Sequence, residues 1–428
     1  MTQLLQLRSG HMGLGLLIDV IGRYAVIGVA FALPISTALS NIFLGLVLVC
    51  WLASGQYKDK FRLFINNPIA LASTVLFTWL AISLVWVDDL SYDQVHFFRK
   101  YSNLLFVSIF IWFFLDKTCR SKVIFAFSIS MLLTLALSYL AAFGLLPSMS
   151  WLHATPGNAT IFRLHITQNL MMSLAALIFS LFSVEAWRGG RKFLAALWGL
   201  ACLLALINVM VMVQGRTGYL VVAAFIVLVF GLRAGWRGLL IAGALVCLGS
   251  FAVYEGSDSM RKRVNLAVSE YSNWQSERPV SDGNSIGSRL EFYVNSFNLV
   301  SQRPLVGYGL GSFPVEYKRQ VDGTGRTPTN NPHNEALLLL VQAGIPALLL
   351  FLYLLVRLAL AGRKMSLLSE RVLAPALALW MGVGGVVNAL LIDHAESLLF
   401  SLMMGLLAAA SIASDIPRSP ENGTPVTS

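Results

Sequence analysis

Residues 336–360 have the sequence ALLLLVQAGIPALLLFLYLLVRLAL, an apolar run long enough to cross a bilayer as one helix. The run follows the polar stretch Asn330-Asn331-Pro332-His333-Asn334-Glu335, which carries signals of a helix start. Asn331 can cap the helix, and Pro332 suits its first turn, where a missing N–H costs nothing. His333 would then lie in that first turn, where the helix dipole disfavours imidazolium. This pattern predicts a neutral proton acceptor at the mouth of a membrane helix, or alternatively a histidine that only caps.

The composition of the whole chain is that of a membrane protein. Hydrophobic residues make up 57% of the sequence and charged residues 12%, with a mean hydropathy of +0.71, outside the range of soluble domains. Apolar runs of membrane-spanning length recur along the chain. We therefore predict an all-α polytopic membrane protein with about twelve transmembrane helices, near residues 20–37, 38–54, 68–87, 97–115, 123–145, 166–184, 193–213, 217–232, 237–254, 335–357, 372–392 and 395–413.

The net charge of +10 follows the membrane topology and does not indicate a nucleic-acid partner. Basic residues fall in alternate connections between the spans: Lys58, Lys60, Arg62, Lys117, Arg120, Lys122, Arg188, Arg191, Lys192, Arg233, Arg237, Arg357, Arg363, Lys364 and Arg371. The opposite connections carry few Lys or Arg. By the positive-inside rule the basic side is cytoplasmic, which places both termini in the cytoplasm. Asp19 and Arg23, four residues apart, predict a pair near the cytoplasmic interface.

The chain divides into four parts. Nine spans occupy residues 1–254, a periplasmic loop occupies residues 255–332, and three spans occupy residues 333–413. The tail, residues 414–428, contains several prolines and no apolar pattern, so we expect a disordered cytoplasmic segment. A loop as long as residues 255–332 is typical of functional segments.

Two stretches of the periplasmic loop have apolar residues at helical spacing. These are Met260, Val264, Ala267, Val268 and Tyr271, and then Ile286, Leu290, Tyr293, Phe297 and Val300. We expect amphipathic helices that lie on the bilayer surface and cover a cavity between the spans, although a small self-packed cap is an alternative. Residues 307–311, Gly-Tyr-Gly-Leu-Gly, predict a flexible turn and no nucleotide site, since no strand-to-helix context follows them.

Arginines occur on the outer side, where the positive-inside rule disfavours them. Arg216 lies in Gln214-Gly215-Arg216-Thr217-Gly218, between two spans with almost no loop, and Arg289 lies on the second amphipathic helix. A guanidinium at a helix N-terminus is typical of an anion site. Arg163 and His165 precede the sixth span on the same side. The alternatives are an arginine that reaches the lipid headgroups and a solvated surface arginine.

Two features of the sequence could indicate a metal site in place of this arginine site. Asp88-Asp89 could bind a divalent cation that bridges a diphosphate, but no supporting acids lie nearby, and these residues also suit a helix terminus. The histidines show neither HxxxH nor HExxH spacing for zinc. We therefore predict a site without metal or other cofactor.

The segment from Pro332 to Ala347, PHNEALLLLVQAGIPA, resembles the signature of the O-antigen ligase/polymerase superfamily. Members show a His-Asn or His-Ser pair, then an apolar stretch and a Gly-Ile-x-Gly-like step, in which Ala347 here replaces the second glycine. Ser288-Arg289, the segment 303–313 and Arg216-Thr217-Gly218 are similar to other family motifs. The resemblance covers roughly residues 200 to 400 by motif and the whole chain by topology.

The resemblance implies an integral-membrane, glycosyltransferase-C-like enzyme that uses a lipid-linked donor without a metal. The ligase branch, which the length and the single dominant loop fit best, transfers an O-antigen from undecaprenyl diphosphate to a sugar of lipid A–core. The reaction occurs on the periplasmic face of the bacterial inner membrane. Such a reaction needs cations for the diphosphate and a base for the acceptor hydroxyl. We assign these roles to Arg216 and Arg289 and to His333, with Arg163 and His165 as further donor contacts.

Several alternatives stay open. Sister branches of the superfamily polymerise repeat units or attach glycans to protein, and the motifs separate them poorly from ligases. A flippase or transporter of lipid-linked sugars is the main rival of another class, but internal repeats and mid-membrane charges, typical of transporters, are not evident. A membrane sensor or scaffold would leave His333 and the arginines without a joint explanation.

Overall fold

The computed structural model describes residues 14–87, 92–146, 152–155, 157–213, 215–256, 258–272, 274 and 285–414. Its elements are helices, and no strand occurs among these residues. The predicted disordered tail lies outside the described residues except for Ser414, the last residue of the final helix. The protein is thus an all-α polytopic membrane protein, as the sequence predicts.

The helices that carry the argument are bounded as follows. They are α2 (Leu14–Ala32), α3 (Thr37–Ala53), α4 (Tyr57–Ile65), α5 (Pro68–Ile82), α6 (Tyr92–Tyr101), α7 (Phe106–Phe114), α8 (Lys117–Ala142), α9 (His165–Arg188), α10 (Lys192–Ile207), α11 (Arg216–Gly256), α12 (Asp258–Ser272), α13 (Ser285–Gln302), α14 (Phe313–Val321), α15 (Glu335–Ala361), α16 (Leu368–Val387) and α17 (His394–Ser414). Short helical turns join several of them: η1 (Ser83–Trp86), η2 (Ser102–Leu105), η3 (Asn208–Met212) and η4 (Gly362–Lys364).

The number of spans differs from the predicted twelve. By length and composition, ten helices among the described residues can cross a membrane, or eleven if α3 and α4, bent by 113°, form one broken span. The difference lies in α11, whose 41 residues cover two predicted spans. A straight helix of that size would be about 60 Å long, twice the thickness of the hydrocarbon core.

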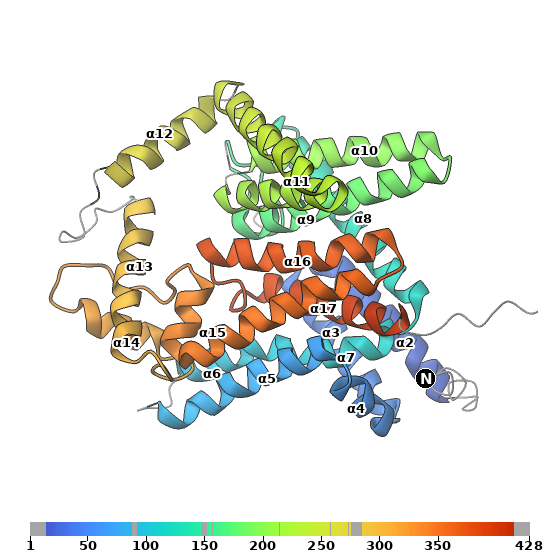
Figure 1. The fold of residues 1–428 in the computed structure, drawn as a ribbon, viewed down its shortest axis with the longest axis horizontal. Helices are drawn as coiled ribbons and strands as arrows, with labels where there is room; N and C mark the ends of the chain where they lie inside the picture. The colour runs from blue at the N-terminus through green and yellow to red at the C-terminus, as the bar shows by residue number, and fades with distance from the viewer. Residues whose placement is uncertain are drawn as a thin grey trace, which may run out of the picture.

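The chain turns back within α11 at Gly235, where the backbone is non-helical (φ 54°, ψ −134°). A Cβ on Gly238 would lie 1.9 Å from the carbonyl oxygen of Phe230, a contact that a straight helix does not allow. Figure 1 shows the two halves running in different directions. With α11 counted as two spans and the bent pair α3–α4 counted as one, the described residues hold twelve, the predicted number.

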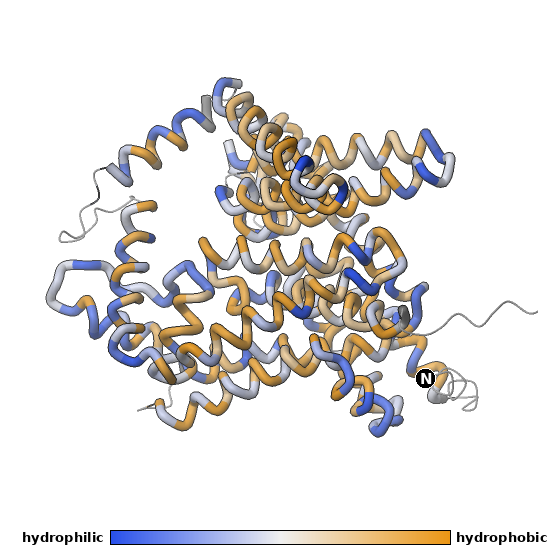
Figure 2. Tube along the Cα trace, viewed as in Figure 1, coloured by the Kyte–Doolittle hydropathy of each residue, from blue (hydrophilic) through white to orange (hydrophobic). Residues whose placement is uncertain are grey.

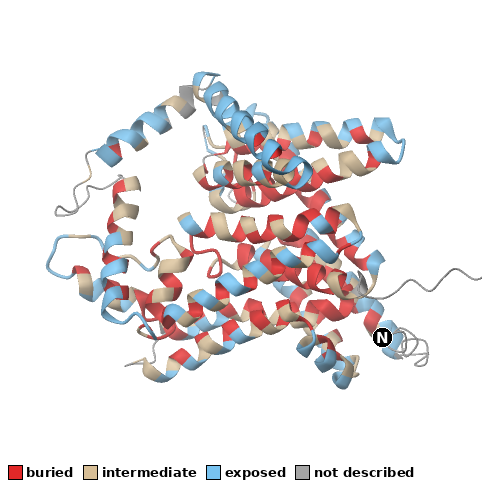
Figure 3. Ribbon diagram, in the orientation of Figure 1, coloured by how far each residue is buried: buried red, intermediate tan, exposed pale blue. Residues whose placement is uncertain are grey.

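The helices form one bundle whose two ends are hydrophilic and whose middle is hydrophobic. Figure 1 shows α12, α13 and α14 at one end, on the left, and the N-terminus and the turn between α9 and α10 at the opposite end. We call the first the α13 end. Hydrophilic residues gather at both ends in Figure 2, with hydrophobic residues between them. In Figure 3 the buried residues concentrate in the central helices, whereas α10 and α11 are largely exposed on the periphery, as lipid-facing helices would be.

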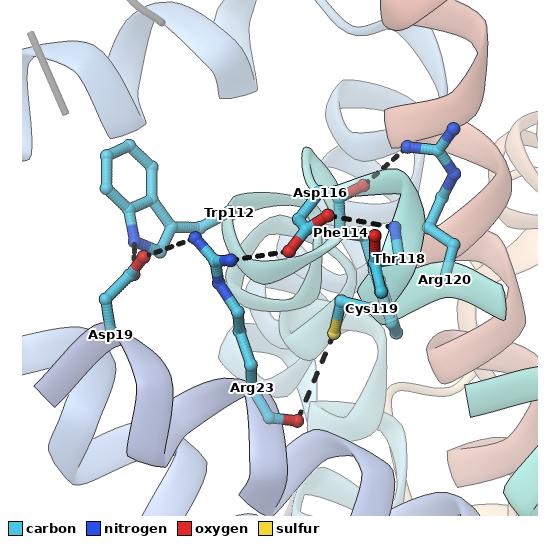
Figure 4. A network of polar contacts seen from close by, with 8 residues as sticks. All are labelled: Asp19, Arg23, Trp112, Phe114, Asp116, Thr118, Cys119 and Arg120. Atoms are coloured by element: carbon cyan, nitrogen blue, oxygen red, sulfur yellow. Dashed lines mark hydrogen bonds and ion pairs between the residues drawn. The ribbon is translucent and has the colours of Figure 1, made fainter. Parts of the chain in front are cut away.

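The end opposite α13 is held by ion pairs, and those of Arg23 are drawn in Figure 4. Arg23 forms the predicted pair with Asp19, at 2.9 Å, and a second pair with Asp116, which caps α8. Arg120 Nε lies 2.7 Å from Glu370 Oε1, and both side chains are almost fully buried. Lys60, also predicted in a cytoplasmic connection, is buried against Trp51. A buried charge needs a close partner. Arg120 and Lys60 each have their partner on another helix, and they therefore stabilise helix packing.

The segment 255–332 packs against the bundle through a break in α15. Gly344 is non-helical there (φ 70°, ψ −168°), and the freed carbonyls of Val341 and Gln342 accept hydrogen bonds from Tyr308 N (2.8 Å) and Gly309 N (2.7 Å). A Cβ on Gly344 would lie 2.2 Å from the carbonyl oxygen of Leu305. We predicted a flexible turn at residues 307–311. These residues are instead packed against the break in α15, and Leu310 is fully buried.

The same segment contains the two predicted amphipathic helices, α12 and α13, and a third, α14, that the sequence pattern did not indicate. On α12, Val264, Val268 and Tyr271 are exposed along one face, which suits a bilayer surface. On α13, Leu299 and Val300 are buried, so this helix is anchored to the protein. The anchored α13 carries Arg289 over the starts of other helices.

Candidate active site

Four of the five predicted site residues meet at the α13 end. Arg216 is the first residue of α11, His165 is the first residue of α9, and His333 directly precedes the cap of α15. Arg289, on α13, interacts through its charge with all three. Residues far apart in the sequence therefore form one cationic cluster, beside three helix N-termini whose dipoles add positive potential.

The start of α15 differs from the prediction. Asn334, not Asn331, is the N-cap, and its side chain accepts a hydrogen bond of 3.0 Å from Leu337 N. Asn331 Oδ1 instead accepts from His333 N at 2.7 Å. His333 consequently lies before the helix, in the left-handed region with φ 54°. Non-glycine residues rarely adopt this conformation, and when they do they often lie at functional sites.

Two neighbours on α13 hold His333 in this conformation. Tyr293 donates its hydroxyl to the carbonyl oxygen of His333 at 3.2 Å. The Phe292 ring stacks on the imidazole, with ring centroids 6.2 Å apart and planes inclined by 23°. Because Arg289 lies one helical turn before Tyr293, the same helix face carries both the cation and the anchor of the histidine.

His333 has the properties of a neutral base. Burial lowers its pKa below the ordinary value, and the Arg289 charge lowers it further. The imidazole is therefore mostly neutral at pH 7. Glu335, two residues after His333, is 1% exposed, and its Oε2 accepts a hydrogen bond of 2.9 Å from Leu391 N inside the bundle.

Arg216 and Arg289 lack a carboxylate counter-ion among the described residues. Burial lowers the pKa of Arg289, and the neighbouring Arg216 lowers it further, although tyrosine Tyr293 acts in the opposite direction. Two guanidinium groups that repel each other in a partly buried site favour an anion between them. Arginines also present the planar fork that matches a phosphate group.

Arg163 has a different environment from the other predicted residues. Its guanidinium donates to the carbonyl oxygen of Leu33, at the end of α2, and to the hydroxyl of Thr37, the first residue of α3. It therefore joins two helices, and its hydrogen bonds do not reach the cationic cluster. His165 is exposed at the start of α9 and is accessible to a ligand.

Buried acids near the cluster were missed by the sequence analysis. Asp393 directly precedes α17, and burial raises its pKa to about 6, with Lys100 acting in the opposite direction. Glu396, two residues into α17, is 2% exposed. Acidic residues at the start of an apolar run could have signalled them, but the same pattern also suits an ordinary helix terminus.

The acidic pair Asp88-Asp89, considered above for a metal, lies outside the described residues. Within the described part of the chain, no group of three or more His, Cys, Asp or Glu side chains could hold a metal ion.

An apolar groove lies along the first half of α11. It has a volume of about 220 Å³ and lies between α9, α10 and α11, with Ser173, Cys202, Val222, Phe225 and Phe230 in its lining. Ser173 Oγ is 3.5 Å from the carbonyl oxygen of Gly218, two residues after Arg216. The groove therefore lies beside the part of α11 that follows Arg216, from Val222 to Phe230.

Comparison with known proteins identifies the central part of the chain. Residues 200–352 match a family model described as O-Antigen ligase. This region contains Arg216, Arg289 and His333 and extends from α10 into α15, whereas Arg163 and His165 precede it. No curated protein matches the chain. The chain is thus a multi-pass membrane protein whose residues 200–352 are similar to the O-antigen ligase family.

Proposed function

We propose that this protein is an O-antigen ligase of the bacterial inner membrane. It transfers a glycan from undecaprenyl diphosphate to a sugar of lipid A–core on the periplasmic face, and both of its termini are cytoplasmic. The observation that carries the proposal is the clustering of two arginines, without carboxylate partners among the described residues, beside the neutral base His333. This combination suits a reaction in which a diphosphate leaves and a hydroxyl attacks.

In the proposed reaction, His333 takes the proton of the acceptor hydroxyl while its oxygen forms a bond to the anomeric carbon of the donor sugar. The bond from that carbon to the phosphate oxygen breaks, and undecaprenyl diphosphate leaves with the electron pair. Arg216 and Arg289 hold the diphosphate and stabilise its developing charge, a role that a metal ion has in many other glycosyltransferases. His165 contacts the donor from α9, and Arg163 supports the site indirectly by joining α2 to α3.

The groove between α9 and α11 supports a lipid donor. A polyprenyl tail is apolar, and its diphosphate must lie at the membrane surface while the tail remains in the hydrocarbon region. Arg216 is the first residue of α11, and Val222, Phe225 and Phe230 follow along the same helix in the lining of the groove, an order that matches this division between charge and apolar chain. The exposed apolar face of α12 is proposed to lie on the bilayer near the incoming donor.

The test is transfer by the purified protein. We expect a synthetic undecaprenyl-diphosphate-linked glycan and a core lipid without O-antigen to yield glycosylated core lipid, detected by mass spectrometry, with or without a chelator. Donor chains that lengthen without a core acceptor would instead indicate a polymerase, and a glycosylated peptide would indicate a protein glycosyltransferase. Movement of a labelled donor across proteoliposomes without bond formation would indicate a carrier. Loss of transfer on chelation would contradict the proposed role of the arginines.

A further inference from the structure

The connection between α16 and α17 is outside the matched domain, yet it contacts the segments that carry the cationic cluster and His333. We call residues 386–391 the tie segment. It begins at the last turn of α16, where helical carbonyls lack intrahelical partners, and continues through buried residues to Leu391. Its polar groups are directed to α11, α13 and the start of α15.

The first contact joins the tie segment to α13 and α15. The carbonyl oxygen of Val386 accepts hydrogen bonds from Tyr293 Oη at 3.0 Å and from Asn334 Nδ2 at 2.9 Å. Tyr293 also binds the carbonyl oxygen of His333, and Asn334 is the residue that follows it. The end of α16 therefore fixes His333 both through Tyr293 on α13 and through Asn334, the cap of α15.

The second contact joins the tie segment to the first residue of α15 in the interior of the bundle. Leu391 N donates to Glu335 Oε2 at 2.9 Å, and a Cβ on Gly385 would lie only 3.2 Å from Glu335 Cβ. This close packing leaves little freedom for the first turn of α15. Deeper in the membrane, Trp380 Nε1 donates to the carbonyl oxygen of Leu170 at 2.9 Å, which holds α16 against α9.

The third contact reaches the helix that begins with Arg216. Asn388 Nδ2 donates to Thr217 Oγ1 at 2.8 Å, and both side chains are 2% exposed. A buried amide-to-hydroxyl bond has no water to replace it, so its loss leaves an unsatisfied group or lets the helix start move. Thr217 is the neighbour of Arg216, and neither Thr217 nor Asn388 needs to touch a substrate for this bond to act.

We propose that Asn388 is a positioning residue, which sets the first turn of α11, and with it the Arg216 guanidinium, relative to His333 through the bond to Thr217. The inference rests on the proposed diphosphate-binding role of Arg216. A misplacement of about 1 Å at a reacting centre can cost about 100-fold in rate. The bond thus links the anion-binding helix to the same tie segment that fixes the base.

The experiment separates positioning from mere stability by using both partners of the bond. Thr217→Val and Asn388→Leu remove one partner each, and the double variant removes both, which restores a matched apolar contact. Binding is measured with undecaprenyl diphosphate as the probe, transfer is measured as KM and kcat, and thermal unfolding is measured in detergent.

We expect each single variant to weaken probe binding and to lower kcat/KM about tenfold or more. The double variant should unfold at nearly the wild-type temperature but keep the loss in binding and rate. Thr217→Ser retains the hydroxyl and should behave nearly as wild type. In an Arg216→Ala background, Asn388→Leu should add little further loss, because the amide acts through that arginine.

The matched control is a bond of the same type elsewhere in the bundle. Asn103 Nδ2 donates to Ser397 Oγ at 3.2 Å, with both side chains buried, and it joins η2 to α17. The pair Asn103→Leu with Ser397→Ala should leave probe binding unchanged.

Recovery of wild-type binding in the Thr217→Val/Asn388→Leu variant would overturn the positioning role and leave a structural bond only. An undiminished effect of Asn388→Leu in the Arg216→Ala background would overturn it as well. If Arg216→Ala itself does not alter binding of undecaprenyl diphosphate, the proposed function fails before the positioning role is tested.

Discussion

At the scale of single residues, the backbone of His333 distinguishes it from a helix-end histidine that only caps. A left-handed φ of 54° in a residue with a Cβ costs free energy, and the hydrogen bonds from His333 N to Asn331 Oδ1 and from Tyr293 Oη to the His333 carbonyl oxygen offset that cost. The ring is partly buried against Phe292 and close to the charge of Arg289. These features orient a neutral imidazole at a cationic site.

Replacement of His333 by alanine should lower the transfer rate by about 100- to 10,000-fold, because the acceptor hydroxyl loses its base. Binding of undecaprenyl diphosphate should persist. In the wild-type enzyme the rate should fall as the pH drops through the titration of His333, with a midpoint below the ordinary histidine pKa because burial and Arg289 lower it. A pH–rate profile of purified protein tests both points, and near-wild-type turnover in the alanine variant would refute the assignment.

The arginines should affect both donor binding and this pH profile. Arg216→Ala and Arg289→Ala should each weaken binding of undecaprenyl diphosphate about 10- to 100-fold, since a charge-assisted hydrogen bond contributes about 1.5–3 kcal/mol. Lysine should restore little, because it lacks the planar fork. Arg289→Ala should also move the acid limb of the pH–rate profile upward, since the Arg289 charge no longer lowers the pKa of His333.

A suitable control for these variants is Arg319→Ala. Arg319 lies on α14, is 63% exposed and pairs with Glu316 at 2.7 Å. Its loss should change neither donor binding nor the pH profile. Unchanged affinity in both Arg216→Ala and Arg289→Ala would show that the diphosphate binds elsewhere.

At the scale of elements, the break of α15 couples the segment 255–332 to the bundle. The carbonyl oxygens of Val341 and Gln342 accept from the backbone of residues 308 and 309, and Ile345 N donates to the carbonyl oxygen of Pro304 at 2.9 Å. These bonds satisfy groups that an unbroken helix would satisfy internally. They also fix the end of α13, the helix that carries Arg289 and Tyr293.

Gly344→Ala should therefore destabilise the protein strongly. The backbone at Gly344 is one that only glycine adopts readily, which costs roughly 1–3 kcal/mol for alanine, and the added Cβ would clash with the carbonyl oxygen of Leu305. Thermal unfolding in detergent measures the effect. The control is Gly45→Ala in α3, where a Cβ meets no atom within 4 Å and helix propensity favours alanine. An equal response of the two variants would contradict the account of the break.

At the scale of the whole molecule, the bundle places its candidate site residues at the α13 end and the ion pairs Arg23–Asp116 and Arg120–Glu370 near the other end. The helix starts of α9, α11 and α15 share the first end, so their dipoles act on the same volume. In the proposed function, a lipid-linked donor reaches this volume from the bilayer while its charged group stays at the surface.

The membrane topology that we predict places the α13 end in the periplasm and the opposite end in the cytoplasm. In a cysteine-free background, Lys318→Cys on α14 should react with a membrane-impermeant maleimide from the periplasmic side, and Arg191→Cys between α9 and α10 should react only after the membrane is permeabilised. The basis is the charge bias of the connections. Labelling of both positions from one side would disprove the proposed topology, and an exchange of the two sides would invert it.

The sequence by itself determined the membrane class, the approximate spans and the pair Asp19–Arg23, because hydropathy and i,i+4 spacing are local properties. It also indicated helices at α12 and α13. The break within α11 was foreseeable as well, since Arg233 and Arg237 flank Gly235 between two apolar runs. The burial of Lys60 and Arg120 was not foreseeable, because their partners lie on other helices.

Tertiary contacts alone decided the geometry of the candidate site. Asn331 and Asn334 are equally good caps by composition, and the bond from Tyr293 to His333 favours the register that begins at Asn334. Asn388 and Thr217 are 171 residues apart, so no local pattern relates them. Helix propensity and hydropathy describe the local conformation of one segment and its preference for water or lipid. The distance between Arg216 and His333 depends on how separate segments pack against one another.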